Sequence, residues 1–341
     1  MCAALVLPRL AMHVIVTSAD DQSTNQVMDW LLHFDEQVVR INPQDTLEMN
    51  NMQLLNGVAD YSITVHKENG TIAQIQSSEV QSFWYRRGCF RFELPRVGAL
   101  MQPTMQAKAN NVLAREVRTA GDFLQLLLEQ GPGFGSPRHN ATNKLSNLKI
   151  AAECGLKVPD FHLIRTKKAL ATLLDNYNGQ VLVKGIHQLA MYMEHKGVCV
   201  HNMSGLLTRD MLKKVPTTFP LSLVQQYIEK RQDLRVFYLD GRCYAAAIFS
   251  QNDPQTRIDF RNYNNDRPNR TVPFSLPRAV EQSVERFMNR VGMASGSIDI
   301  LYSVDKEFVF LEVNPVGQFG MVSQPCNYQL EKRIAEYLCA S

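Results

Sequence analysis

The 341-residue sequence lacks the features by which several protein classes are recognised. No apolar run approaches the roughly 20 residues that a transmembrane helix needs, so we expect no membrane partner. The seven cysteines include no Cys-x-x-Cys pair, which argues against a disulfide framework or a zinc site and favours reduced thiols in a cytoplasmic protein. A net charge of +3 is too small to indicate a nucleic-acid partner.

What the sequence contains is an alternation of short apolar strands and helical segments, typical of a mixed α/β fold with two or three domains. Residues 1–11 lack a basic start and an export cleavage site, and we interpret them as an extension ahead of the first strand. Strands are predicted at His13–Thr17, Gln37–Ile41, Tyr61–Val65, Thr71–Ile75, Val80–Tyr85, Phe161–Arg165, Val181–Gly185, Leu221–Ile228, Leu234–Leu239 and Cys243–Ile248. Helices are predicted at 26–34, 105–130, 143–154, 167–176, 278–292 and 328–338.

A glycine-rich segment, Gly131–Gly135 (GPGFG), interrupts the pattern after the longest predicted helix. It lacks the Gly-Lys-Ser/Thr sequence that would make it a phosphate-binding loop. We therefore interpret this segment as a linker between domains.

The most informative stretch is Ser297–Pro315, which predicts two apolar strands around a turn at Val304–Glu307. If the turn is centred between Asp305 and Lys306, Asp299 lies opposite Glu312, with Cβ atoms roughly 5 Å apart. Asn314 then points to the same face as Glu312. Two carboxylates and an amide oxygen in an apolar setting suit a hard cation such as Mg²⁺. The alternative is a buried hairpin whose acids bond to backbone, and a turn one residue longer would separate the two acids.

Two lysines and one polar segment are further candidates. Lys184 ends an apolar strand, where it could project its charge onto a phosphate, and Lys144 lies in a predicted first helical turn. Either lysine could equally be a solvated surface residue. In Gln225–Arg235 an apolar strand runs into charged residues. Backbone groups at such a junction can form hydrogen bonds with an adenine edge, and Glu229 or Asp233 can accept hydrogen bonds from ribose hydroxyls. An ordinary solvated loop explains the segment equally well.

Arginine is concentrated in one region of the chain. Ten arginines and no lysine occur from Arg231 to Arg290. The planar guanidinium recognises phosphate and carboxylate groups in a bidentate manner, which lysine cannot do. The anion-binding candidates are those in strands or irregular segments: Arg235, Arg257, Arg261 and Arg270.

Taken in order, these residues resemble the motifs of the ATP-grasp superfamily: a lysine, a strand-end lysine, a Gln-x-Tyr-Ile hinge, Asp-x-Arg, and Asp…Glu-x-Asn. This similarity covers roughly residue 140 to the C-terminus. A closer resemblance, from His13 onward, is to the peptide maturases that make graspetides, in particular the grasp-with-spasm branch. It is carried by Trp84–Arg87 (WYRR), Asp259–Asn264 (DFRNYN), Pro268–Arg270 (PNR) and Phe310–Gly320 (FLEVNPVGQFG).

The resemblance implies an ATP-grasp fold in three parts. These are an N-terminal pre-ATP-grasp α/β domain at 12–130, a central lid domain at 140–224 and a C-terminal domain with the Mg/ATP site at 225–341. Related lids carry a glycine-rich loop, and this chain is short of glycine between Gly185 and Gly197. The implied roles are Lys144 and Lys184 on the phosphates, Gln225, Gln226, Tyr227 and Ile228 at the adenine, Glu229 and Asp233 at the ribose, Asp299, Glu312 and Asn314 on Mg²⁺, and Arg235 and Arg261 near the transferred phosphoryl group.

The implied function is an ADP-forming carboxylate ligase that uses ATP and Mg²⁺. It would activate Asp or Glu side chains of a ribosomal precursor peptide, with leader and core segments, and close ester or amide rings with Ser, Thr or Lys. Its peptide-binding candidates are Arg86, Arg87, Arg257 and Arg270, although Trp84–Arg87 could instead be a strand end that packs structurally. The family also implies a homodimer. The alternatives are a ligase for an amino acid or a protein tail, and a nucleotide-dependent peptide-binding protein without catalysis.

Overall fold

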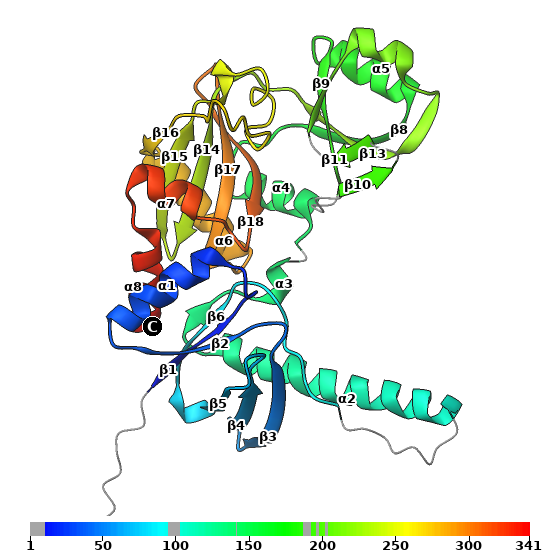
Figure 1. Cartoon of the computed structure of the whole chain (residues 1–341). Coiled ribbons are helices and arrows are strands. Elements are labelled where there is room, and N and C mark those ends of the chain that lie inside the picture. The colour runs from blue at the N-terminus through cyan, green and yellow to red at the C-terminus, as the bar shows by residue number, and fades with distance from the viewer. Residues whose placement is uncertain (1–10, 95–102, 141, 187–191, 196–197, 202–203) are drawn as a thin grey trace, which may run out of the picture. The chain divides into compact units, whose positions relative to one another are not determined.

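The computed structural model describes residues 11–94, 103–140, 142–186, 192–195, 198–201 and 204–341 (Figure 1). The chain divides into two compact units, which we describe separately. The first is Met1–Asn140 together with Gln329–Ser341, and the second is Ala141–Tyr328. The strands and helices together form the mixed α/β class that the sequence predicts.

A parallel sheet forms the centre of the first unit, with strand order β2-β1-β6-β7. Its central strand β1 (Met12–Val16) is buried along its whole length, which fits its β-branched residues. The other strands are β2 (Gln37–Ile41), β6 (Val80–Tyr85) and β7 (Gly133–Phe134).

Helices flank this sheet. Helix α1 (Gln22–His33) begins earlier than predicted because Asp21 caps it, its side chain accepting a hydrogen bond from the Thr24 amide. Helix α8 (Leu330–Ala340), at the end of the chain, packs against α1 and β6. Helix α2 (Pro103–Gln130) contributes Leu124 and Leu128 to the core, and the short α3 (Pro137–Asn140) ends the unit's first segment.

The GPGFG segment is not the predicted linker, because Gly133–Phe134 forms strand β7 and pairs with β6. Both Gly133 and Gly135 have positive φ values, +121° and +91°. A Cβ atom at these positions would lie 1.9 Å from the Phe83 carbonyl oxygen and 2.0 Å from that of Tyr85. The glycines thus permit the close approach of an edge strand, rather than flexibility between domains.

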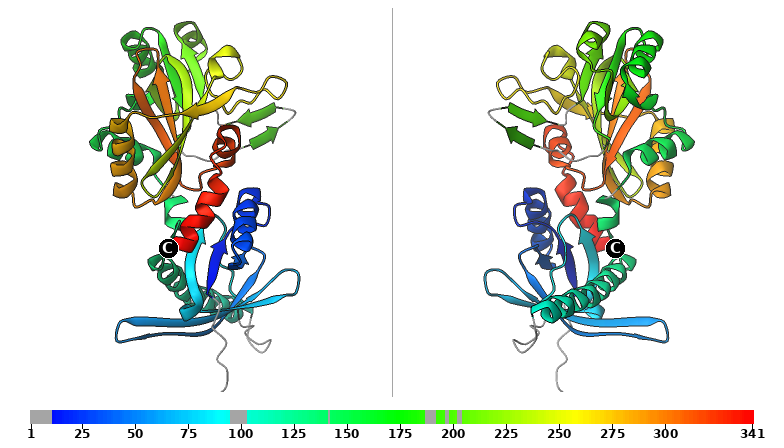
Figure 2. Two further views of the ribbon diagram at one scale, coloured as in Figure 1. Left: turned by 90° about the vertical axis from the view of Figure 1, so that its left-hand side faces the viewer. Right: turned by 90° about the vertical axis from the view of Figure 1, so that its right-hand side faces the viewer.

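A separate antiparallel sheet in the first unit has the order β3-β4-β5. The hairpin of β4 (Val58–His66) and β5 (Ile72–Gln76) was predicted. Strand β3 (Thr46–Leu55) was not, because its polar residues and a register shift between Met49 and Asn51 interrupt the alternation of a strand. Figure 2 shows the long β3–β4 hairpin projecting from the rest of this unit.

The second unit contains a smaller antiparallel sheet with strand order β12-β9-β13-β8. The strands are β8 (Phe161–Thr166), β9 (Gln180–Lys184), β12 (Gly205–Thr208) and β13 (Thr218–Gln226). Helix α5 (Lys167–Asn176) packs Leu170 and Leu174 against this sheet. Strands β10 (Tyr192–His195) and β11 (Val198–His201) form a separate antiparallel pair.

The main sheet of the second unit has the order β16-β15-β14-β17-β18. Its strands are β14 (Lys230–Leu239), β15 (Arg242–Ile248), β16 (Thr271–Phe274), β17 (Ser295–Ser303) and β18 (Phe308–Asn314). The helices of this part are α4 (Lys144–Glu153), α6 (Arg278–Arg290) and α7 (Gly320–Cys326).

The two faces of this main sheet differ in chemistry. One face packs Val236, Ile298 and Val313 against α4 and α6 in a hydrophobic core. Side chains alternate along a strand, so the intervening residues Arg235, Asp299 and Glu312 belong to the opposite face. The fold therefore presents a row of charged groups on one side of an apolar sheet.

Candidate functional site

The predicted pairing of Asp299 with Glu312 is confirmed, as is the turn between β17 and β18. The register nearer the turn is shifted by one residue, because Ile300 pairs with Phe310 and Tyr302 with Phe308. A bulge at Leu311 corrects this shift before the acids are reached. Without the bulge, the residue opposite Asp299 would be Leu311 and not the carboxylate.

The charged row continues onto a third strand. Arg235 on β14 pairs in register with Asp299, and its Nη1 donates to Asp299 Oδ1 at 2.6 Å. Asp299 is 6% exposed, and burial followed by the neighbouring Glu312 raises its pKa despite the opposing effect of Arg235. The two acids therefore repel each other in a low-dielectric setting.

Glu312 receives cations from two other elements. Lys144 at the start of α4 forms an ion pair with Glu312 Oε2, and Arg261 Nη1 lies 3.3 Å from Oε1. Burial alone would raise the pKa of Glu312, but Lys144 and Arg261 outweigh burial and lower it. Asn143, directly before Lys144, caps α4 and so fixes the position at which the lysine emerges.

Lys184 lies at the end of β9 and faces the same charged group. Burial, and then the charge of Lys144, lowers the pKa of Lys184 to about 8. Glu312 and Asp259 oppose this shift. For Lys184, burial together with the neighbouring positive charges thus outweighs the attraction of the nearby acids.

The predicted hinge borders the same cavity. Gln225 on β13 is 1% exposed, and neither its amide nitrogen nor its amide oxygen has a hydrogen-bond partner within the described residues. An unpaired buried amide is costly, so this donor and acceptor are available to a ligand. Burial and the neighbouring Glu229 raise the pKa of Tyr227, while Arg257 opposes them.

The two predicted ribose residues differ. Glu229 lies exposed in the turn after β13. Asp233 is 4% exposed and already occupied, because Lys230 Nζ lies 2.8 and 2.7 Å from its two oxygens and Ser250 Oγ donates to Oδ2. Lys230 Nζ also donates to the Ile258 carbonyl at 3.3 Å, which links β14 to the loop leading to Arg261.

A single cavity joins these groups. The predicted residues that line it are Lys144, Lys184, Gln225, Gln226, Tyr227, Ile228, Asp233, Arg261, Asp299 and Glu312. Sequence reasoning missed Lys230 and Asp259 among the charged lining residues, as well as apolar walls formed by Leu182, Ile258 and Phe260.

Asp259 positions one of the predicted arginines. Its carboxylate accepts from Arg261 Nε at 2.9 Å and Nη2 at 2.7 Å, and these hydrogen bonds raise the pKa of Arg261. Asp259 is buried, whereas the Arg261 side chain is 47% exposed. The Asp-Phe-Arg spacing was the available signal for this pair, since it places the acid two residues before the arginine.

Several predicted residues do not line this cavity. Arg235 contacts the cavity only indirectly, through its hydrogen bond to the lining residue Asp299. The Asn314 side-chain oxygen accepts a hydrogen bond from the Gly317 amide at 3.3 Å. Arg257 is exposed beside the lining residue Ile258, and the exposed Arg270 guanidinium lies 5.7 Å from the Phe249 ring centroid.

Arg86 and Arg87 belong to the first unit. Arg86 is 4% exposed and donates to Asp21 Oδ2 at 3.0 Å and to Ser23 Oγ at 3.0 Å. Arg87 Nε lies 3.1 Å from the same Asp21 oxygen, and its side chain is 36% exposed. Of the two, Arg87 is the more accessible to a partner.

The acidic pair fits a hard divalent cation. Asp299 and Glu312 supply oxygen ligands from adjacent strands, which is the donor type that Mg²⁺ prefers. A cation bound between them would offset both the burial and the repulsion from Glu312 that raise the pKa of Asp299. The nearby lysines and arginine suit the phosphates that accompany Mg²⁺.

The family model of the RimK-like ATP-grasp domain matches residues 141–338, which is more than half of the chain. The chain belongs to the RimK-like ATP-grasp family. The ATP-grasp fold expected from the sequence motifs is thereby confirmed.

Solved structures share this fold over nearly the full length. A RiPP-associated ATP-grasp ligase of Chryseobacterium gregarium, in complex with ADP and a leader and core peptide, is 19% identical with a TM-score of 0.72, covering 97% of this chain and 96% of that one. The macrocyclase MdnC of Microcystis aeruginosa, bound with precursor peptide MdnA, is 21% identical with a TM-score of 0.68, covering 97% and 100%.

The ATP-grasp ligase PsnB, complexed with a precursor variant, Mg and ADP, is 17% identical with a TM-score of 0.64, covering 97% of this chain and 98% of that one. Among curated proteins, none matches this chain. None of the helices in the described part of this ATP-grasp protein has the length and apolar character needed to cross a bilayer.

Proposed function

We propose that this protein is an ADP-forming carboxylate ligase whose substrate is a ribosomally made precursor peptide. The observation that carries the proposal is one cavity in which two adjacent acids, two lysines, an arginine and an unpaired buried glutamine meet. This combination matches the needs of a magnesium nucleotide: oxygen ligands for the metal, cations for phosphates, and amide groups for a base.

In this proposal Gln225–Ile228 bind the adenine and the exposed Glu229 binds the ribose. Lys144 and Lys184 hold the phosphates, and Asp299 and Glu312, with Asn314 beyond them on β18, hold Mg²⁺. Asp233 keeps its expected place beside the nucleotide, but its contacts with Lys230 and Ser250 favour a structural contribution over a ribose contact.

When bound, Mg²⁺ would neutralise phosphate charge and orient the terminal phosphoryl group for transfer. Arg261, held by Asp259, and Arg235, held by Asp299, supply fixed positive charge near that group. An arginine guanidinium is protonated at any working pH, and the hydrogen bonds to Asp259 raise the pKa of Arg261 further. Preorganised charges of this kind stabilise a transition state without reorganising during the reaction.

The chemistry then has two steps. A carboxylate oxygen of a peptide Asp or Glu forms a bond to the γ-phosphorus while the bond from that phosphorus to the β–γ bridging oxygen breaks, which gives an acyl phosphate and ADP. A Ser or Thr hydroxyl, or a Lys amine, of the same peptide attacks the acyl carbon. Phosphate leaves, the nucleophile loses a proton, and an ester or amide ring closes. The second step is intramolecular, which contributes much of its rate.

The peptide substrate is supported by the motif resemblance and by the leader, core and precursor peptides bound to the similar ligase structures. The exposed Arg257 and Arg270 and the partly exposed Arg87 are the peptide-binding residues that this proposal favours, and Arg86 contacts the same Asp21 oxygen as Arg87. We further propose that the chain has three parts, at 12–130, 140–224 and 225–341, and that it forms a homodimer. A cytoplasmic location is in keeping with the free cysteines.

The test is to incubate the purified protein with ATP, Mg²⁺ and the peptide encoded beside its gene, and to measure intact peptide mass. Ring closure removes one water per ring, and mild base then separates esters from amides. A gain in mass would favour a tail or amino-acid ligase. An unchanged peptide with no ADP release would contradict catalysis on this substrate.

A further inference from the structure

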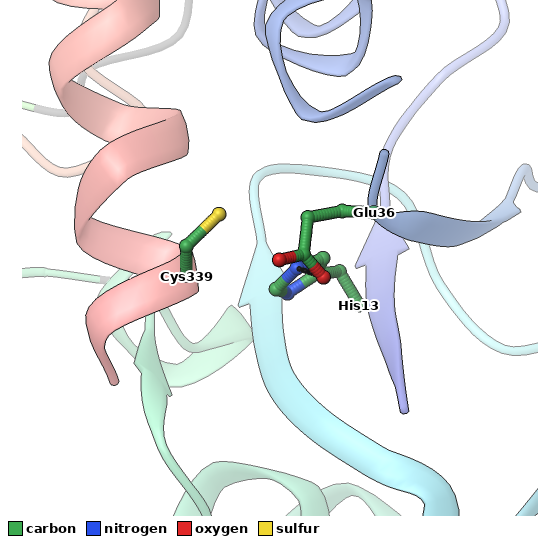
Figure 3. A group of neighbouring side chains, drawn as sticks. All are labelled: His13, Glu36 and Cys339. Atoms are coloured by element: carbon green, nitrogen blue, oxygen red, sulfur yellow. Dashed lines mark hydrogen bonds and ion pairs between the residues drawn. The ribbon is translucent and has the colours of Figure 1, made fainter. Parts of the chain in front are cut away.

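Three side chains that the site above does not use meet in the first unit. His13 lies on β1, Glu36 directly precedes β2, and Cys339 lies in the last turn of α8. One ligand atom from each, a ring nitrogen, a carboxylate oxygen and the sulfur, all lie within 4.8 Å of one another. Figure 3 shows Cys339 on its helix facing the Glu36 carboxylate and the His13 ring.

The His13 ring is held by the neighbouring strand. His13 is fully buried and pairs in register with Ser82 on β6. Its Nδ1 lies 2.7 Å from Ser82 Oγ, and its Nε2 lies 3.3 Å from Glu36 Oε2. A hydrogen bond at one ring nitrogen fixes the orientation in which the other faces a ligand, as the partners of metal-binding histidines do.

The Cys339 turn is also fixed in place. Gln81, next to Ser82 on β6, donates from Nε2 to the Cys339 carbonyl at 3.2 Å. Helix α8 packs along α1 and against β6, so the thiol is held by packing as well as by this bond. Two consecutive residues of one strand therefore hold the histidine and the cysteine toward the same point.

Two groups of this cluster have shifted pKa values, and the three groups differ in donor type. Burial and the adjacent Glu36 raise the pKa of the Cys339 thiol to about 11. Burial lowers the pKa of His13, although Glu36 opposes the shift. An imidazole, a carboxylate and a thiol together offer the three donor types that a borderline metal ion accepts.

We propose that His13, Glu36 and Cys339 form a binding site for a borderline divalent metal ion such as Zn²⁺, with water as the fourth ligand. The mixed nitrogen, oxygen and sulfur donors select this class of ion over Mg²⁺, which prefers oxygen alone. Ligand atoms of a tetrahedral zinc site lie roughly 3.5 Å apart, so small side-chain rotations close the present cluster around an ion.

A bound metal ion would connect three elements of the first unit. The three ligands come from the first strand, the start of the second strand and the final helix, so a bound ion fastens α8 onto the parallel sheet. On binding, the thiol releases its proton to solvent and becomes a thiolate ligand. The site is chemically distinct from the Asp299–Glu312 pair, and its occupancy does not depend on the proposed ligase function.

The test uses the full-length reduced protein with Co²⁺ as a spectroscopic stand-in for zinc. Excess Mg²⁺ is present throughout to occupy the oxygen-only site. The expected result is one equivalent of Co²⁺ per chain with a sulfur-to-cobalt charge-transfer band, and a melting temperature that rises on addition of Zn²⁺. Cys339→Ala abolishes the band, and Glu36→Gln weakens binding.

Two variants serve as matched controls. His66→Gln removes the exposed His66–Glu48 pair, a histidine–carboxylate contact at 3.2 Å in the same unit. Cys89→Ser removes an exposed free thiol. Both should leave the cobalt band unchanged. Because His13 is fully buried, its substitution perturbs folding as well as binding, so Cys339→Ala and Glu36→Gln decide the matter.

Absence of a sulfur-to-cobalt band in the wild-type protein would overturn the proposal. A band that survives Cys339→Ala, or that disappears in Cys89→Ser, would overturn it as well, because the sulfur ligand would then be a different cysteine.

Discussion

Two clusters of charge on the main sheet of the second unit invite comparison. In the first, which we call the closed cluster, the Asp233 carboxylate contacts one ammonium group, that of Lys230, and one hydroxyl, that of Ser250. In the second, which we call the open cluster, the carboxylates of Asp299 and Glu312 form ion pairs with Arg235 on a strand, Lys144 on a helix and Arg261 in a loop. Lys230 and Asp233 side chains are 6% exposed, against 13% and 12% for Lys144 and Glu312.

The two clusters differ in how far their charges are balanced by neighbouring groups. The closed cluster satisfies its own charges and holds the loop before Arg261 through the Ile258 carbonyl. The open cluster keeps two repelling acids and two neighbouring lysines, one with a pKa lowered to about 8. Unrelieved repulsion at a cavity is typical of functional sites, whereas loss of one partner from a buried, hydrogen-bonded pair destabilises the fold. We therefore expect the first cluster to control stability and the second to control chemistry.

The largest effect is expected from Glu312→Gln. It removes a metal ligand at the site of phosphoryl transfer, and turnover should fall at least about a thousandfold. The free energy of unfolding should fall less than in Asp233→Asn, because relief of the repulsion with Asp299 offsets part of the lost ion pairs with Lys144 and Arg261. Peptide-stimulated ADP release and urea denaturation measure the two quantities. The matched control is Glu307→Gln on the same hairpin, where the Lys157 pair is exposed. Turnover retained in Glu312→Gln would refute the assignment of the metal site.

Substitution in the closed cluster should change the stability of the protein more than its activity. Asp233→Asn leaves the Lys230 ammonium buried without its counter-charge, which should lower the free energy of unfolding by about 3–5 kcal/mol. The double variant Lys230→Met/Asp233→Leu should recover much of that loss, since no buried charge remains. If Asp233→Asn instead left stability unchanged and weakened nucleotide binding, Asp233 would be a ligand contact after all.

Lys184→Met should separate stability from binding. The folded protein lowers the pKa of Lys184 from 10.5 to about 8, so at neutral pH its charge destabilises the fold. Removing the charge should stabilise the nucleotide-free protein by about 1–3 kcal/mol, while ADP affinity falls because a phosphate contact is lost. Lys149→Met, at an exposed i,i+4 pair on α4, is the control. A Lys184→Met variant that bound ADP as well as the wild type would contradict the phosphate contact.

The same lysine gives a pH dependence whose sign is fixed. Its folded pKa lies below its unfolded value, so the destabilisation is fully present below pH 8 and fades as pH rises from about 8 toward 10.5. Phosphates bind the protonated form, so ADP affinity should fall above pH 8, approaching tenfold per pH unit. Calorimetric titration with ADP between neutral and alkaline pH should show this fall in affinity in the wild type and not in Lys184→Met. If ADP affinity fell with pH to the same extent in that variant, the titrating group would be a residue other than Lys184.

The smallest effect is expected from Gln225→Leu. Replacing an unpaired buried amide by an apolar group of similar size should stabilise the nucleotide-free protein by about 1 kcal/mol. Adenine nucleotides should bind several-fold more weakly, while inorganic phosphate competes unchanged. Equal affinity of the variant and the wild type for ADP would show that Gln225 faces something other than the base.

The sequence predicted the open cluster better than the closed one, and β-bulges explain why. Asp299 and Glu312 were found because their spacing places them opposite each other across a short turn. The pairing holds only because of the bulge at Leu311, which alternation of residue types does not reveal. Lys230 and Asp233 should point to opposite faces of a regular strand. A register shift between Lys230 and Gln232 brings them to the same side, so the pattern hid the pair.

Long-range contacts were likewise beyond the sequence. The helices at 167–176 and 143–154 were predicted closely, because Thr166 and Asn143 are local caps. The cluster of His13, Glu36 and Cys339 joins the two ends of the chain, and no spacing rule for metal ligands covers such separations. Cysteine spacing alone therefore does not bear on a mixed cluster of this kind.

The central claim is that the open cluster holds a magnesium nucleotide, and an ADP titration tests it without knowledge of the peptide. Calorimetry with and without Mg²⁺ would be run on the wild type, Glu312→Gln and Glu307→Gln. The account predicts that Mg²⁺ strengthens ADP binding in the wild type and in Glu307→Gln, and that this gain is lost in Glu312→Gln. An equal magnesium effect in all three proteins, or none in the wild type, would contradict it.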